Sequence, residues 1–462
     1  MLATSTHAAL ADQYLDRLAF GWQARNRALD SHVLDLADLS KRDQILQSCA
    51  RALTLTGRGT AELMQARLKE PLTRGELFAM ALHAIGGRDA GLHRACVALV
   101  QAVATLRAAY ASALEWAAPQ NAWWALNQWS QAPIGQSGDG GAIVAVMALI
   151  AARAHPQISA QLGDTPWWRQ IMHGTQPSAE GRHAVDIALM QFALASAHPH
   201  AGGQALALLQ SPLAQVRCIA AEVVWWQALQ PPSQGAIKPA LDTLLALATH
   251  ADSADSTPHA GSGQATQALA CRRHADFDAV LSTLKAQPRQ LGLYLQALGW
   301  SGRSQAVPEL MAYLEHPLHA RAAGAALSML TGSLPARDGW QAPPQAPTQT
   351  AAAGEAEPDS ATIPSAPAHA DLPPPDPAGF ARWWSKHKQD FADKTTWLAG
   401  LPETPANLVT VLQRGKLAWR KVAARRLHAL QGDPVLNTSA PTLQQHQWLA
   451  KHATPPTKRP IA

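Results

Sequence analysis

Apolar residues recur at three- and four-residue spacing along the first part of the chain. Four segments, Gln13–Ala28, Ser40–Leu55, Thr60–Leu68 and Gly75–Ile85, show the spacing of amphipathic helices. Short polar or glycine-containing breaks separate them, and no window alternates apolar and polar residues strictly enough to predict a strand. We therefore expect residues 1–109 to form an N-terminal helical region.

Two stretches of the middle region match each other without a gap. ALEWAAPQNAWWAL at Ala113–Leu126 and ALGWSGRSQAVPEL at Ala297–Leu310 share Ala, Leu, Trp, Ala and Leu at five positions 184 residues apart. The match extends outward to Tyr110 and Tyr294. Each stretch is predicted to hold the end of one helix, a turn and the start of the next.

A second pattern combines a turn-like start, a Leu, an Arg and a pair of small residues on a helix. It occurs at Ser211–Val224, His316–Leu327 and Gly415–Leu427. Repeats of about 40–47 residues with two helices each are typical of HEAT-type α-solenoids, in which stacking of the units builds the core. We predict an all-α fold, with HEAT-like antiparallel helix pairs over residues 110–340 and a polar inserted loop at Ala251–Thr266.

The pattern changes again toward the end of the sequence. Gln341–Pro377 is rich in Pro and Ala and lacks apolar periodicity, so residues 341–378 are predicted to be a disordered linker. Residues 379–462 are predicted to be C-terminal helical repeats. Their expected helices are Phe380–Leu401, Thr404–Arg414 and Ala418–Leu430.

Composition supports a helical fold with a weakly charged surface. The chain has 462 residues, of which 47% are apolar and 15% charged, below the roughly 25% charged residues of typical globular chains. Ala and Leu, which lead the helix propensity ranking, are abundant. The net charge of +5 is small for this length, so nucleic-acid binding is the less favoured interpretation. It would require arginines on one concave face, with Arg27, Arg217, Arg321 and Arg420 as candidates.

Cysteine usage and apolar runs indicate a cytoplasmic protein. Cys49, Cys96, Cys218 and Cys271 are widely separated, which is typical of reduced core residues. The first residues lack the features of a secretory signal. The longest apolar run, Ala142–Ala152, is too short to span a bilayer, which needs about 20 residues. We expect no membrane span.

Catalytic, cofactor and metal motifs are not evident. Cys271 and His274 have CxxH spacing, but a structural zinc site usually takes four ligands. The glycines of Gln136–Ile143 precede a helix without a phosphate-binding fingerprint. No GxSxG elbow occurs. We therefore expect no catalytic, cofactor-binding or metal-binding residues and no enzyme; an unrecognised active site would require a deep pocket with convergent polar groups.

Tryptophan is the unusual residue of this chain. Half of the 16 tryptophans stand in adjacent pairs. Neighbouring helical residues point about 100° apart, so both members of a pair cannot easily face one core. A basic run at Arg414–Arg426 adds a potential surface for an anionic partner. The candidate partner-binding residues are Trp123, Trp124, Trp225, Trp226, Arg420 and Arg425.

The chain resembles an uncharacterised HEAT-repeat-like protein family of bacteria, found mostly in proteobacteria and myxobacteria. The resemblance lies in SALEW at Ser112–Trp116, in ALGWSGRSQAVPEL with HARAAGAALSMLTG at His319–Gly332, and in the segment Trp397–Leu430. Trp22–Arg27 and Gly75–Met80 are also similar. Some members are encoded beside type VI secretion genes, and the family has no catalytic residues to carry over.

These observations predict a non-enzymatic protein-binding scaffold or adaptor. Alternate helices of the solenoid would line a concave face that binds another protein. The resemblance implies a type VI secretion effector or assembly component as partner. The alternative is a nucleic-acid-binding solenoid that uses concave-face arginines.

Overall fold

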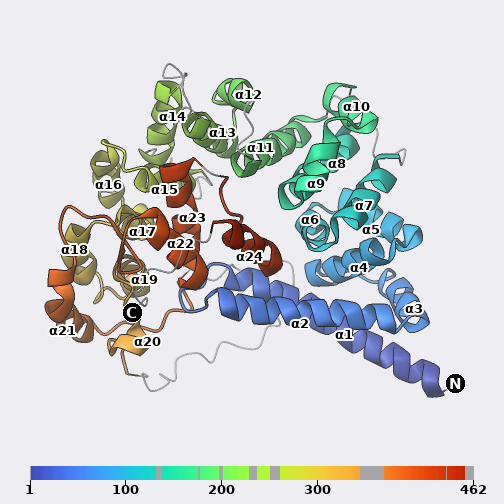
Figure 1. Ribbon diagram of the computed structural model, residues 1–462, viewed down its shortest axis with the longest axis horizontal. Coiled ribbons are helices and arrows are strands. Elements are labelled where there is room, and N and C mark those ends of the chain that lie inside the picture. The colour runs from blue at the N-terminus through green and yellow to red at the C-terminus, as the bar shows by residue number, and fades with distance from the viewer. Residues whose placement is uncertain are drawn as a thin grey trace.

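The protein is predominantly helical in the part of the chain that the structure describes, which confirms the predicted all-α class (Figure 1). The computed structural model describes residues 2–131, 138–174, 177–196, 201–227, 237–249, 261–343, 369–432 and 434–452. The α-helices are α1 Leu2–Ala28, α2 Leu36–Leu55, α3 Arg58–Arg67, α4 Arg74–Gly87, α5 Ala90–Ala102, α6 Arg107–Trp116, α7 Pro119–Gln131, α8 Gly138–Ala154, α9 Pro156–Leu162, α10 Pro166–Gly174, α11 Ala179–Ser196, α12 Ala201–Leu208, α13 Ala214–Gln227, α14 Ile237–Thr249, α15 Ser262–Cys271, α16 Phe277–Lys285, α17 Leu291–Ser301, α18 Val307–Ala312, α19 Ala320–Thr331, α20 Pro335–Asp338, α21 Pro377–His387, α22 Pro405–Arg414, α23 Leu417–Gln431 and α24 Thr442–Lys451. The 3-10 helices are η1 Ala104–Leu106, η4 Pro288–Gln290, η5 Ser304–Ala306 and η6 Lys388–Asp390, and the strands are β1 Trp397–Leu398 and β2 Leu401–Pro402.

Successive helices follow an arc, and the C-terminal helices lie inside it (Figure 1). One row of helices runs through α4, α6, α8, α11, α13, α15, α17 and α19, each in contact with the next. α5, α7, α14, α16 and α18 pack against this row. α22, α23 and α24 fill the middle of the arc, where α23 contacts α15 and α24 contacts α2. The concave side of the arc is therefore in contact with the chain's own C-terminal helices.

The two matching stretches adopt the same local structure. η1 and α6 begin 184 residues before η4 and α17, so the match in structure starts earlier than the match in sequence. Tyr110 and Tyr294 are buried on the first helix of each pair, and Leu126 and Leu310 return to the core from the second. The prediction of helix end, turn and helix start is confirmed for both stretches.

Among the described residues, the buried side chains form three core clusters. The first runs from α1 to α9 and continues across residue 110, where the sequence predicted a boundary. The second runs from α11 to the hairpin at Trp397. The third joins the C-terminal helices to Leu36 of α2, Cys271 of α15 and Met329 of α19. This third cluster connects both ends of the arc.

Two expectations for local structure need correction. The helix expected over Phe380–Leu401 ends at His387, and a two-stranded antiparallel hairpin, β1–β2, follows it. The loop expected over Ala251–Thr266 gives way to α15 at Ser262, because the apolar pattern of that helix begins before the loop was expected to end. Residues 251–260 lie outside the described residues.

The predicted linker is ordered at both ends. Leu372 is buried, and the N–H of Ala342 donates to the carbonyl of Pro374 at 2.8 Å. The N–H of His32 donates to Oδ2 of Asp371 at 3.1 Å, which ties this segment to the loop between α1 and α2. Residues 344–368 lie outside the described part of the chain, so the prediction of disorder remains untested there.

Candidate functional site

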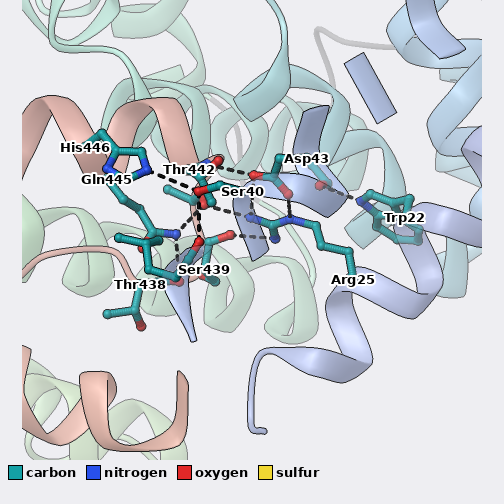
Figure 2. A network of polar contacts seen from close by, with 12 residues as sticks. Trp22, Arg25, Ser40, Asp43, Thr438, Ser439, Thr442, Gln445 and His446 are labelled. Atoms are coloured by element: carbon teal, nitrogen blue, oxygen red, sulfur yellow. Dashed lines mark hydrogen bonds and ion pairs between the residues drawn. The ribbon is translucent and has the colours of Figure 1, made fainter. Parts of the chain in front are cut away.

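Segments from opposite ends of the sequence meet at a buried ion pair (Figure 2). Arg25 on α1 donates from Nε to Oδ1 of Asp43 on α2 at 2.7 Å, and both side chains are almost fully buried. The same guanidinium donates to the carbonyls of Ser439 at 2.9 Å and Ala440 at 2.8 Å. The N–H of Thr442 donates to Oδ2 of Asp43 at 2.7 Å. We call these five residues the closing junction.

The closing junction has the bonding that a buried ion pair needs. Removing two charges from water is unfavourable unless further hydrogen bonds satisfy them. Here the two backbone carbonyls and the N–H of Thr442 supply those bonds. Gln445 supports the same loop, because its Nε2 donates to the carbonyl of Ala440 at 2.6 Å. The ion pair of Arg25 and Asp43 therefore holds the start of α24 against α2.

A second contact joins the start of α23 to the loop before α2. The N–H of Leu417 donates to the carbonyl of Leu34 at 2.9 Å, and the N–H of Ala418 donates to that of Ser31 at 3.0 Å. The Nζ of Lys421 pairs with Asp30. The N-terminal region therefore binds the C-terminal helices through backbone and side-chain bonds.

The C-terminal helices are also bonded to the arc at the two matching turns. Nε2 of Gln444 on α24 donates to the carbonyl of Glu115 at 2.9 Å, next to Trp116. Nη2 of Arg426 on α23 donates to the carbonyl of Trp300 at 2.6 Å. Arg426 is buried and also pairs with Glu403, whose Oε2 lies 3.0 Å from Nη1. The inner helices are thus held on both sides.

Three of the six candidate partner-binding residues are buried and a fourth, Arg425, is half-buried, which differs from the expected surface role. Arg420 is fully buried and donates to the carbonyl of Leu412 at 2.6 Å. Arg425 lies 3.7 Å from the buried carboxylate of Glu222. The physical reason is that α23 lies inside the arc, so its basic face meets the chain rather than solvent.

Trp225 and Trp226 are also buried, with 8% and 6% of their surfaces exposed. The guanidinium carbon of Arg272 lies 4.2 Å and 3.5 Å from their ring centroids. The ring of Trp226 packs against His428 of α23 with centroids 4.1 Å apart. This pair joins the arc to the inner helices instead of facing a partner.

The other two candidates, Trp123 and Trp124, are half-buried on α7. Trp167 and Trp168 on α10 are half-buried as well. The ring centroids of Trp123 and Trp167 are 6.1 Å apart, and those of Trp167 and Trp168 are 6.3 Å apart. Nε1 of Trp167 donates to Oδ1 of Asn127 at 2.8 Å. The ring of Trp124 packs instead against His93, with centroids 5.3 Å apart. We call Trp123, Trp167 and Trp168 the tryptophan surface.

Buried histidines are used for packing. Nε2 of His93 lies 2.6 Å from the hydroxyl of Tyr110, and burial lowers the pKa of His93 to about 4. Burial likewise lowers the pKa of His32 to about 4, despite the nearby Asp371. Both imidazoles are neutral at pH 7. Among the described residues, no group of three or more His, Cys, Asp or Glu side chains is placed to hold a metal ion.

The sequence reasoning did not find the closing junction. Arg25 bonds a carbonyl 414 positions away, and a single Arg or Asp on an amphipathic helix gives no signal of such a partner. The Trp167–Trp168 pair was visible as an adjacent pair, but only the fold brings it beside Trp123.

Comparison with known proteins adds no relative. No family model, no curated protein and no solved structure matches this chain. No helix among the described residues is both long and apolar enough to cross a bilayer.

Proposed function

We propose that this protein is a non-enzymatic, cytoplasmic scaffold that binds another protein through its tryptophan surface. The observation that carries the proposal is the chain of ring contacts that joins half-buried Trp123 on α7 to Trp167 and Trp168 on α10. These helices lie on the part of the arc that does not face α23 and α24 (Figure 1). A partner therefore reaches them without displacing the chain's own C-terminal helices.

The composition of this region suits protein recognition. Tryptophan is enriched among the residues that dominate binding energy, and effective sites combine an aromatic centre with a polar rim. Gln128, Gln131 and Gln170 are exposed on the same two helices. Arg169 and Asp164 form an exposed pair beside Trp168, with Nη2 and Oδ1 3.8 Å apart. Packing against the first core cluster holds the indoles in place, which reduces the entropy lost on binding.

The family resemblance supplies a candidate partner, a type VI secretion effector or assembly component. Nucleic-acid binding is less well supported by the arginines. Nη1 of Arg217 donates to the carbonyl of Ser211 at 2.8 Å, Nη1 of Arg321 donates to that of Ala370 at 3.4 Å, and Arg420 is buried. Three of the four arginines on which that alternative depends are thus bonded to the backbone.

Co-isolation from the native host with a Trp168→Ala variant tests the proposal. Truncating a central interface tryptophan typically costs at least about 2 kcal/mol, or roughly a thirtyfold loss of affinity. We expect recovery of the bound protein to fall accordingly. Trp384→Ala is the matched control, since Trp384 is a half-buried member of another adjacent pair, on α21. Equal recovery with both variants would refute the proposal.

A further inference from the structure

A cavity separate from the tryptophan surface lies between α2, α4 and the end of α6. Its volume is about 240 Å³. Leu18, Ala50, Leu53, Ala79 and Leu82 form an apolar wall. This volume is below the roughly 300–1,000 Å³ of sites for drug-sized ligands, so the cavity suits a small molecule or a single side chain.

The polar side chains that line this cavity are hydrogen-bond donors or are uncharged. Gln47 and Arg51 lie one helical turn apart on α2, and His83 lines the opposite side from α4. The lining contains no Asp or Glu. Asp89, the acidic group that acts on His83, already accepts the N–H groups of Gly91 and Leu92 at the start of α5. An anionic ligand therefore meets no acidic side chain in the cavity wall.

Two side chains of the cavity have unused hydrogen-bonding capacity. Arg51 is exposed and makes no hydrogen bond or ion pair within the described chain. Nδ1 of His83 is shielded from solvent and has no partner among the described residues. Buried polar atoms nearly always have a hydrogen-bond partner. A ligand in the cavity would supply the partner that Nδ1 of His83 lacks among the described residues.

An aromatic ring closes the remaining side. Trp116 is half-buried and lines the cavity. Its edge-to-face contact with Phe78, with centroids 5.9 Å apart, and the guanidinium of Arg25, 5.3 Å from the ring centroid, fix its position. A fixed indole next to a free guanidinium offers one surface for an apolar body and one group for a carboxylate.

We propose that this cavity binds a small carboxylic acid with an apolar body. The apolar part lies against Leu82 and Trp116, and the carboxylate pairs with Arg51, while His83 and Gln47 contribute hydrogen bonds. This site shares no residue with the tryptophan surface. Loss of either activity therefore leaves the other measurable.

Calorimetric titration of the full chain with 4-phenylbutyrate tests this inference. We expect saturable binding that weakens at least about tenfold in Arg51→Gln, because one charge-assisted pair is lost. Arg42→Gln, on the same helix and outside the cavity lining, is the control and should bind like the unmodified protein. His83→Gln reports on the second polar group without changing its charge at pH 7 and should also weaken binding.

Two further ligands test whether the site requires the carboxylate and whether it prefers a small molecule to a peptide. 4-Phenylbutanamide, which has the same body without the charge, should bind at least tenfold more weakly than the acid. A short peptide ending in Phe with a free carboxylate should not bind more tightly than the acid. Absence of binding, binding unchanged by Arg51→Gln, or a clear preference for the peptide would each overturn the assignment.

Discussion

The two matching stretches of the chain, α6–α7 and α17–α18, have the same backbone plan and different surroundings. Each begins with a 3-10 turn, buries a tyrosine on its first helix and ends that helix next to a tryptophan. Each turn also offers a backbone carbonyl to an inner helix, from Glu115 to Gln444 and from Trp300 to Arg426. The residues that repeat are therefore those that build and close the arc.

The two stretches differ in their second helices, α7 and α18. Trp123 and Trp124 on α7 correspond to Val307 and Pro308 on α18, 184 positions later. Val307 is fully buried, whereas Trp123 and Trp124 are half-exposed, and the ring of Trp123 contacts Trp167 of α10. The first stretch thus carries an aromatic surface that the second lacks. The packing positions are therefore duplicated, whereas the half-exposed tryptophans are not.

The strongest test of this comparison removes the inner attachment of each stretch. Arg426→Leu leaves the buried carboxylate of Glu403 without one of its partners and should lower the free energy of unfolding by about 3–5 kcal/mol. Gln444→Ala removes one part-buried hydrogen bond and should cost about 1 kcal/mol. Denaturant unfolding monitored by circular dichroism measures both. Equal losses would show that the two attachments are equivalent.

The second prediction concerns pH and the partner of the first tyrosine. His93 has a pKa of about 4 in the folded protein, below its ordinary value near 6.5, because it is buried. The unfolded chain binds a proton below pH 6.5 and the folded chain does not, so stability is full above pH 6.5 and falls toward pH 4. His93→Gln should reduce the difference in unfolding free energy between pH 7 and pH 5 by about 2 kcal/mol.

His32 keeps its own contribution in that variant, so some dependence on pH remains. The matching position in the second stretch is Phe277, 184 residues after His93, which has no titrating group. An unchanged pH dependence in His93→Gln would contradict a neutral buried imidazole.

The third prediction compares the two tyrosine hydroxyls. Tyr110→Phe leaves the buried His93 without its hydrogen-bond partner and should cost about 1–3 kcal/mol. Tyr294→Phe should cost less, about 1 kcal/mol, because its partner Glu309 keeps an ion pair with Lys285. Thermal unfolding of the two variants at one pH gives the ranking. A larger loss of stability in Tyr294→Phe than in Tyr110→Phe would contradict this ranking.

Local periodicity predicts several of the helices and the matching turns, but not the end of α21 or the hairpin that follows it. The apolar spacing of Gln13–Ala28 marks most of α1, and the Tyr110 and Tyr294 stretches fold alike. Burial of Arg420 was not predictable, because it depends on α23 folding back inside the arc. A basic helix has the same pattern whether it faces solvent or a distant carboxylate.

The tryptophan pairs are a second case in which the sequence pattern does not predict which side chains are buried. Adjacent tryptophans indicated that one member of a pair would not fit a core, yet Trp225 and Trp226 are both buried against Arg272 and the inner helices. Trp123 stays half-exposed because its neighbours on α10 cover only part of it. Which pair reaches the surface depends on long-range packing, which the sequence pattern does not encode locally.

Site-directed photo-crosslinking in the native host tests the central claim most directly. A photoreactive phenylalanine analogue replaces Trp168 in one sample and Leu318 in another, since Leu318 is an 80% exposed apolar residue near the second stretch. We predict a discrete crosslinked protein from position 168 and none from position 318. Crosslinking from position 318 alone, or from neither position, would contradict recognition through the tryptophan surface.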